Sequence, residues 1–271
     1  MFRRISLVPM LVGSLLAVGL SAQTPAPQAP DGVILSFVRF ADAYGARLVA
    51  AFDSIPATRY DYRPMPVQQS IGYIAQHLED ANYAQCERIG GQTHQRTAKD
   101  ALPDTVKAKW PKDTLVARLN ASLRFCDDAM ERLSRLDSPA IASQLLALET
   151  DLAEHYSQLA VYMRLLGLVP PSALPPKART AIALPPNQLP PFVGVYELAP
   201  GLDLAITLRD GALYAQSSNG GNLVRLFPET PTQFFAKDVD AQITFTRDAS
   251  GSVTGLIVHQ FGRDRPAARK R

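Results

Sequence analysis

Residues 151–164, DLAEHYSQLAVYMR, place an acid and a histidine one helical turn apart. Side chains four residues apart lie one above the other on a helix, so Asp151 and His155 point the same way. The surrounding apolar residues recur at three- and four-residue spacing, which is typical of a helix that buries one side. They are Leu145, Leu148, Leu152, Leu159, Tyr162 and Leu166. His155 is therefore predicted to point inward and to be hydrogen-bonded, paired or metal-bound, because an unsatisfied polar ring costs about 1–3 kcal/mol.

A second inward histidine is predicted in the segment IGYIAQHLEDANYAQC. His77 stands three residues from Ile74 and four from Ala81, so it too leans toward a buried side. Together with Asp151 and His155 it would form a set of two histidines and one carboxylate. Such a set can hold Zn²⁺ or Fe²⁺ and leave a position open for water, a thiol or another substrate. Buried histidines are also commonly satisfied by hydrogen bonds, and the spacing leaves this alternative open.

Helices must position these side chains, because the hydrophobic pattern before residue 170 has helical period. Four helices are predicted, at about residues 31–55, 70–89, 113–136 and 139–167. Ser70 and Asp113 are candidate N-caps, and Gly90-Gly91 ends the second helix. Four amphipathic helices of this length predict an up-down bundle, whose sites are built from side chains on facing helices.

A proline-rich segment, PPSALPPKARTAIALPPNQLPP, divides the chain into two domains. Proline removes backbone donors and holds the chain extended, so residues 170–188 are predicted to be a linker. The predicted bundle covers residues 31–169, and residues 189–271 alternate in the manner of strands. Seven or eight short strands predict a small antiparallel β-barrel or sandwich. Their turn signals are Asp210-Gly211, Asn219-Gly220 and Ser250-Gly251.

The N-terminus, residues 1–22, has the layout of a secretory signal peptide. Arg3 and Arg4 precede an apolar run from Ile5 to Leu20, and small residues follow as a cleavage site. We therefore expect a secreted or periplasmic protein. No later segment reaches the roughly 18 unbroken apolar residues of a membrane span, so no membrane span is expected.

The charge balance bears on the partners. The chain has 28 Lys and Arg against 25 Asp and Glu, and two of the arginines lie in the signal. A nearly neutral mature protein lacks the strong positive charge that attracts nucleic acid, so no nucleic-acid partner is expected. A small-molecule substrate or ligand is expected instead, and the sequence leaves open whether the protein forms a homo-oligomer.

Cys86 and Cys126 are the two cysteines of the chain. Each lies near one end of a predicted helix, and exported proteins can form and keep disulfides. We therefore expect one disulfide between neighbouring helices, provided that the two Cα atoms come within about 7 Å. Two buried free thiols are the alternative, because Cys126 lies on the apolar stripe of its helix.

Three stretches resemble the DinB-like (DinB/YfiT) superfamily of four-helix bundles, over about residues 31–175. They are RYDYRPMP, SIGYIAQHLEDANYAQC and EHYSQLAVYMRLLGLVPPS. The resemblance implies that a histidine of the second helix and two histidines four apart on the last helix bind a divalent metal. His77 matches the first of these positions and His155 matches the last. Characterised relatives include thiol-dependent transferases and isomerases, while many members have no known activity.

Asp151 stands where this resemblance leads us to expect another histidine. An aspartate can still coordinate, and it favours harder metals than imidazole does. Alternatively, it marks a member that has lost its metal and kept the fold, and a buried Asp151 would then need a partner or a path to solvent. The expected cofactor is a divalent metal, Zn, Ni or Fe.

The C-terminal region, residues 189–271, resembles the lipocalin-like domain of unknown function that often follows penicillin-binding-protein-like serine hydrolases. The matching stretches are PPFVGVYEL, LRDGALYAQ, FPETPTQFFAKDVDAQITFTRD and GSVTGLIVHQFGRDRPAARK. The chain has neither the G-x-S-x-G nor the S-x-x-K motif of serine hydrolases. An accessory module is therefore predicted.

Two functions follow as alternatives. The first is a metal-dependent enzyme of the thiol transferase or hydrolase type, in which the ion makes a bound water or thiol nucleophilic. The second is a non-catalytic envelope protein that binds a ligand or partner and keeps a degenerate metal site. Gln158, three residues past His155, could orient a ligand, but it is interpreted as a packing or surface residue. His94 is expected to be solvated in a loop, and His259 receives no role.

Overall fold

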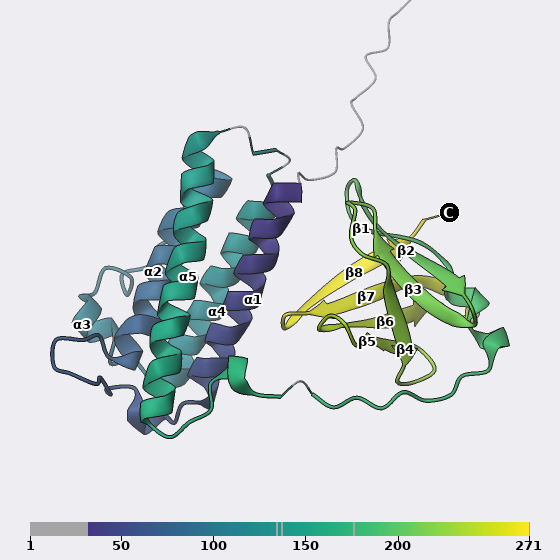
Figure 1. Cartoon of the computed structure of the whole chain (residues 1–271). Helices are drawn as coiled ribbons and strands as arrows, with labels where there is room; N and C mark the ends of the chain where they lie inside the picture. Colours follow the sequence, from purple (N-terminus) through teal and green to yellow (C-terminus); the bar gives the residue numbers. More distant parts are fainter. Residues whose placement is uncertain (1–31, 134, 137, 176, 271) are drawn as a thin grey trace, which may run out of the picture.

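The computed structural model describes residues 32–133, 135–136, 138–175 and 177–270. The predicted signal segment, residues 1–22, lies outside the described residues. A helical domain comes first and a β-barrel follows, and an extended segment joins them (Figure 1). The prediction of a helical bundle followed by a small antiparallel barrel is confirmed.

Four long helices form the first domain. They are α1 (Gly32–Ser54), α2 (Ile71–Gly90), α4 (Lys112–Glu131) and α5 (Pro139–Leu165), and a single turn, α3 (Asp104–Lys107), precedes α4. α2 begins at its predicted cap, where the Ser70 hydroxyl accepts a hydrogen bond from the Tyr73 amide, and it ends at Gly91 in the left-handed conformation. Within the described part of the chain, no helix is both long and apolar enough to cross a membrane.

The ends of α4 differ from the prediction. The helix begins at Lys112 after Pro111, so Asp113 is not its N-cap. Asp113 lies in the first turn instead, where a negative charge is favourable to the helix dipole. The helix ends at Glu131 and does not reach Leu136, because the chain turns here to enter α5.

α2 and α4 run side by side in the same direction. The Asn82 amide donates a hydrogen bond to the Ser122 hydroxyl at 3.0 Å, and one turn further along Cys86 is bonded to Cys126. Residue numbers thus rise together along both helices, because residues 91–111 carry the chain back to the end where α2 begins. α1 and α5 run the opposite way (Figure 1). The predicted up-down order of the four helices is therefore wrong, because two helices that follow each other in the bundle, α2 and α4, point in the same direction.

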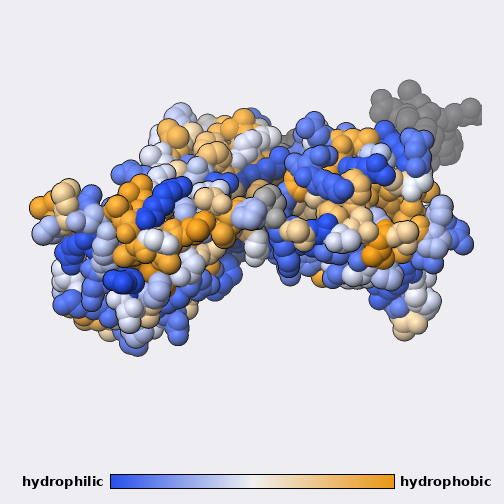
Figure 2. Space-filling view, turned by 60° about the horizontal axis from the view of Figure 1, so that its bottom comes forward, coloured by the Kyte–Doolittle hydropathy of each residue, from blue (hydrophilic) through white to orange (hydrophobic). Residues whose placement is uncertain are grey.

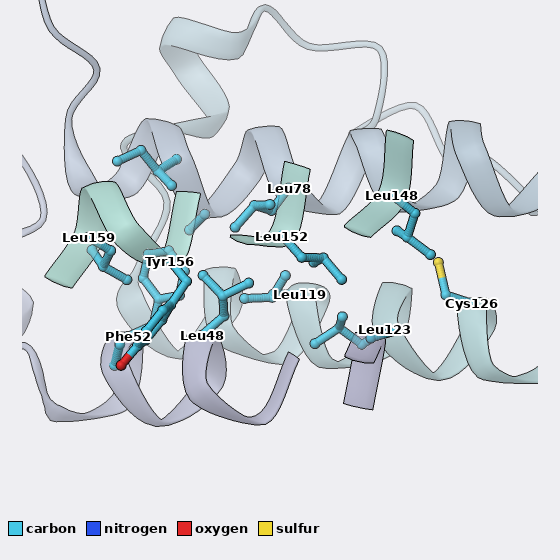
Figure 3. Packing of buried hydrophobic residues seen from close by; sticks show 14 of the residues in the cluster. Leu48, Phe52, Leu78, Leu119, Leu123, Cys126, Leu148, Leu152, Tyr156 and Leu159 are labelled. Carbon is cyan, nitrogen blue, oxygen red and sulfur yellow. The ribbon is translucent and has the colours of Figure 1, made fainter. Parts of the chain in front are cut away.

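The core of the bundle is built from one face of each long helix. Leu48 of α1, Leu78 of α2, Leu119 of α4 and Leu152 of α5 are fully buried and converge in Figure 3. Burial of one such side chain contributes about 1.5–3 kcal/mol. This shared core fixes the rotation of α2 and α5 about their axes, and the rotation decides where their histidines point.

The second domain is a closed barrel in which eight antiparallel strands follow in sequence order. They are β1 (Gly194–Ala199), β2 (Leu202–Arg209), β3 (Ala212–Ser217), β4 (Val224–Pro228), β5 (Gln233–Ala236), β6 (Ala241–Arg247), β7 (Val253–Gln260) and β8 (Arg263–Arg269). Tyr196, Ile206 and Phe245 belong to the side chains that fill the interior. Asp210 and Gly211 both have positive φ, 48° and 72°, as the predicted hairpin turn requires.

The end of the β7–β8 hairpin meets the helical domain (Figure 1). Nε of Arg263 is 2.7 Å from Oδ1 of Asp42 on α1, and the same guanidinium pairs with Asp127 on α4. Arg265 also pairs with Asp42, at 2.5 Å. A cleft of about 710 Å³ lies beside these ion pairs. Charged contacts thus join the two domains in addition to the covalent linker.

Candidate metal centre

Asp151 lies between the two histidines that the sequence singled out. Its Oδ1 atom is 3.5 Å from Nε2 of His77 and 3.4 Å from Nε2 of His155. The two imidazole rings meet edge to face, with centroids 4.8 Å apart. One ligand atom from each of the three residues lies within 4.8 Å of the other two. The tertiary structure therefore brings all three side chains together.

Two antiparallel helices, α2 and α5, position the cluster. His77 is on α2, and Asp151 and His155 are one turn apart on α5. The neighbouring residues Leu78 and Leu152 are fully buried and anchor both helices in the core. The His77 side chain is 37% exposed whereas the His155 side chain is 9% exposed. The cluster is therefore closed on its inner side and open to solvent at His77.

The spacing of the donor atoms suits a small divalent ion. Ligand atoms about 2.1 Å from a tetrahedral ion lie about 3.4 Å from one another, and both distances from Asp151 Oδ1 to the histidine nitrogens match this value. The three donor atoms lie within 4.8 Å of one another, so the two imidazoles would move closer together around an ion. Asp151 Oδ2 is buried and has no hydrogen-bond partner among the described residues. Two imidazoles and one carboxylate are ligands that Zn²⁺ and Fe²⁺ accept. His77, Asp151 and His155 could therefore hold a divalent metal.

The histidines keep Asp151 ionised. Burial alone would raise the pKa of this carboxyl, but hydrogen bonds and charge attraction from His155 and His77 outweigh burial and lower the pKa to about 2. Burial also disfavours the charged form of His155, but its contact with Asp151 is stronger and raises the pKa of the imidazole. Asp151 is thus in the carboxylate form that metal coordination requires.

Two side chains behind His155 set the direction of its ring. Nδ1 of His155 is 3.0 Å from Oε1 of Gln158, and the Gln158 amide donates to the Tyr162 hydroxyl at 3.0 Å. Because the amide oxygen of Gln158 accepts, Nδ1 of His155 is the donor in this contact, and Nε2 is the ring nitrogen that faces Asp151. The Asp151 carboxylate favours a proton on Nε2 as well, and a metal ion at this site would have to replace that proton. The interpretation of Gln158 as a packing or surface residue was therefore wrong. Its three-residue spacing from His155 on one helix face was the signal in the sequence.

The other two histidines lie away from this cluster. His94 was expected to be solvated, but its ring stacks on Tyr83 with centroids 3.6 Å apart, because the loop after α2 folds back onto that helix. His259 on the barrel contacts the Thr244 hydroxyl through Nε2 and the Asp264 carboxylate through Nδ1. Neither histidine contributes to the candidate metal centre.

A disulfide joins Cys86 of α2 to Cys126 of α4, with the two Cα atoms 5.1 Å apart. It lies at the end of α2 that is far from Ser70, about two turns beyond His77. The bond holds the helix that carries His77 against its parallel neighbour.

Fold and site together define a four-helix bundle with a candidate divalent-metal centre, followed by a closed β-barrel. Residues 41–159 match the model of the DinB superfamily, and residues 178–268 match the model of a domain of unknown function, DUF3471. The chain therefore carries a DinB-superfamily domain followed by a DUF3471 domain. The first match includes His77, Asp151 and His155, and members of the DinB superfamily bind divalent metals.

The chain has no match among curated proteins and only a slight likeness to solved structures. A comparison with curated proteins found no match. Among solved structures, the chain is similar at 22% identity to one described as the crystal structure of SurE with D-Leu, over 45% of this chain and 28% of that chain, with a TM-score of 0.32. This chain thus spans less than a third of that chain, and we draw no argument from so slight a likeness.

Proposed function

We propose that the helical domain is a metal-dependent enzyme of the thiol transferase or hydrolase type that acts on a small molecule. The convergence of the Nε2 atoms of His77 and His155 on Oδ1 of Asp151 is the observation that carries this proposal. His77, Asp151 and His155 would hold a divalent ion, which would supply Lewis acidity that lowers the pKa of a water or thiol beside it.

Each residue has a separate task in this proposal. Asp151 supplies the anionic ligand, and His155, held in place by Gln158, supplies an imidazole of fixed orientation. His77 borders the side that is open to solvent, where a substrate can enter. A hollow of about 480 Å³ adjoins the cluster at Asp151, and neither histidine lines it.

The aspartate also bears on which metal the site selects. Compared with a third imidazole, Asp151 adds a negative charge and a hard oxygen ligand. Among Zn, Ni and Fe, this donor set favours Zn²⁺ or Fe²⁺, which accept mixed nitrogen and oxygen ligands and retain an open position.

We also propose that the protein is exported. Residues 1–22 have the layout of a secretory signal, and the Cys86–Cys126 disulfide is a bond that persists in oxidising compartments. The mass of the protein from a secreted or periplasmic fraction is expected to correspond to a chain that begins after Ala22. A full-length mass in that fraction would contradict cleavage at this site.

A non-catalytic ligand-binding protein is the second candidate. Asp151 pairs with both histidines, so the polar atoms of the cluster are largely satisfied without an ion. In this alternative the bundle keeps the cluster for stability, and a ligand binds elsewhere on the protein.

Metal content separates the two candidates. We expect elemental analysis of the purified mature protein to find about one Zn, Ni, Fe or Mn per chain, and to find none in His77→Ala or Asp151→Ala. Glu154→Ala is the matched control, because Glu154 neighbours His155 on α5 but lies outside the cluster. Wild-type protein without metal after reconstitution would contradict the enzyme proposal and favour the non-catalytic one.

A further inference from the structure

A groove of about 730 Å³ runs between α1 and α5. Phe37 and Phe40 of α1 and Leu146 and Ala153 of α5 line it. Phe40 is 50% exposed and Leu146 is 62% exposed, so large apolar side chains face water here. Hydrophobic surface is visible on the helical domain in Figure 2. A contiguous apolar surface of this kind marks a place where something binds.

Glu149 lies in this groove without a counter-charge. The residue is 7% exposed, and neither of its carboxylate oxygens has a hydrogen-bond partner among the described residues. The Ala41 amide lies close enough to favour the charged form, but it does not reach hydrogen-bond geometry. Burial raises the pKa of Glu149 to about 8, and a buried carboxyl group without hydrogen-bond partners is costly. A ligand that brings donors to Glu149 would remove this cost.

The charged residues that line the groove are acidic. Glu154 also lines the groove, and none of the described residues that line it is basic. Asp42 also acts on Glu149, but its charge is balanced by Arg263 and Arg265 of the barrel. The faces of aromatic rings such as Phe37 and Phe40 attract cations as well. An apolar and acidic groove is complementary to a cation with an apolar body.

We propose that the α1–α5 groove binds a small amphiphilic amine. The Glu149 oxygens are shielded from solvent, so the side chain must turn into the groove before the ammonium group can donate hydrogen bonds to it. The hydrocarbon or aromatic body lies against Phe37, Phe40 and Leu146. The ammonium brings three donors to two oxygens that have none, and the apolar body covers side chains that now face water. Glu149 and Asp151 are two residues apart and so project from different sides of α5. The amine would therefore contact none of the three candidate metal ligands, although the groove shares Leu146, Thr150 and Glu154 with the hollow beside Asp151.

Calorimetric titration of the mature protein with decylammonium, decanol and decanoate tests the proposal. We expect decylammonium to bind with one molecule per chain and at least about tenfold more tightly than decanol, and decanoate not to bind. Glu149→Gln keeps the size of the side chain and removes its charge, so it is expected to weaken decylammonium binding by about tenfold or more. Asp53→Asn, an exposed acid of α1 that lies outside the groove, is the control and should change binding by less than about threefold.

A second variant shows whether a loss of binding comes from the groove itself and not from misfolding or from loss of the metal. Ala153→Trp fills the groove and is expected to abolish decylammonium binding, while the metal content of the same sample is unchanged. Equal affinity for the three probes, or binding that survives both Glu149→Gln and Ala153→Trp, would overturn the proposal. A dimer in sedimentation that Phe40→Asp dissociates would assign this face to a second copy and would overturn it too.

Discussion

At the scale of single residues, Gln158 shows how one polar side chain can orient a metal ligand. It accepts from Nδ1 of His155 and donates to Tyr162, so the imidazole is held from behind while Nε2 faces Asp151. Partners of this kind fix both the tautomer and the direction of a ligating histidine. Gln158 is thus a positioning residue in the proposed metal centre.

Gln158→Leu is expected to weaken metal binding by about 10–100-fold, because the His155 ring loses the bond that fixes it. Competition with a chromophoric chelator measures this affinity. Ser157→Ala changes the exposed neighbouring residue and should leave the affinity unchanged. If Gln158→Leu binds metal as tightly as the wild type, Gln158 does not position His155.

A second prediction concerns Asp100, in the loop between α2 and α3. Its carboxylate accepts from the Thr97 amide and hydroxyl and pairs with Arg118. Burial acts to raise the pKa of Asp100, but these contacts outweigh it and lower the pKa from 3.8 to about 2. Because the pKa is lower in the folded state, this carboxylate stabilises the fold above about pH 4, and the contribution is lost as the pH falls toward 2.

Asp100→Asn is therefore expected to lower the free energy of unfolding by about 1 kcal/mol at pH 7 and by much less near pH 2. Urea unfolding at both pH values measures the difference. A loss that is equal at the two pH values would show that Asp100 acts through packing and not through its charge.

At the scale of elements, the parallel pair of α2 and α4 is the part of the bundle with a covalent cross-link. The Cys86–Cys126 disulfide lies one turn beyond the Asn82–Ser122 hydrogen bond. A disulfide stabilises mainly by restricting the unfolded chain, and here the enclosed loop has a sequence separation of 40.

Replacing both cysteines by alanine is expected to cost about 2–4 kcal/mol of unfolding free energy. Urea unfolding of wild type and variant, each with and without a phosphine reductant, measures this cost. The reductant should destabilise the wild type by a similar amount and leave the double variant unchanged. A wild type that is indifferent to reductant would contradict the prediction.

At the scale of the whole molecule, two arginines of the barrel hold it against the bundle. Arg263 bridges Asp42 and Asp127, and Arg265 adds a second contact to Asp42. Asp42 is 3% exposed, and burial raises its pKa against the opposing effect of the two arginines. A carboxylate buried in this way depends on its counter-charges, so the contact needs both partners.

The double variant Arg263→Ala, Arg265→Ala is expected to separate the barrel from the bundle. Asp42 then has no counter-charge while it is buried, and separation of the domains lets water solvate its carboxylate. Small-angle X-ray scattering of the mature protein should show a larger radius of gyration than in the wild type. Arg209→Ala, at the exposed end of β2, is the control. An unchanged scattering curve for the double variant would show that other contacts fix the domains.

The local features of the fold were predictable because they depend on neighbours in the chain. Ser70 caps α2, and Asp210-Gly211 turns between β2 and β3, because a hydroxyl reaches the third amide and the turn needs positive φ. The Asp151–His155 pair follows from one helical turn alone. The end of α4 was predicted at Leu136, but the helix ends at Glu131. The apolar residues keep helical spacing beyond Glu131, although the chain already turns there toward α5.

The sequence by itself determined the types of element, their approximate bounds, the division into two domains and the residues that could form the site. Only the tertiary structure decided that α2 runs parallel to α4, that His77 meets Asp151, and that Arg263 reaches Asp42. The physical reason is the distance along the chain over which each kind of interaction acts. Caps, turns and periodicity act within a few residues, whereas these contacts join surfaces far apart in the chain through the sum of many weak packing interactions.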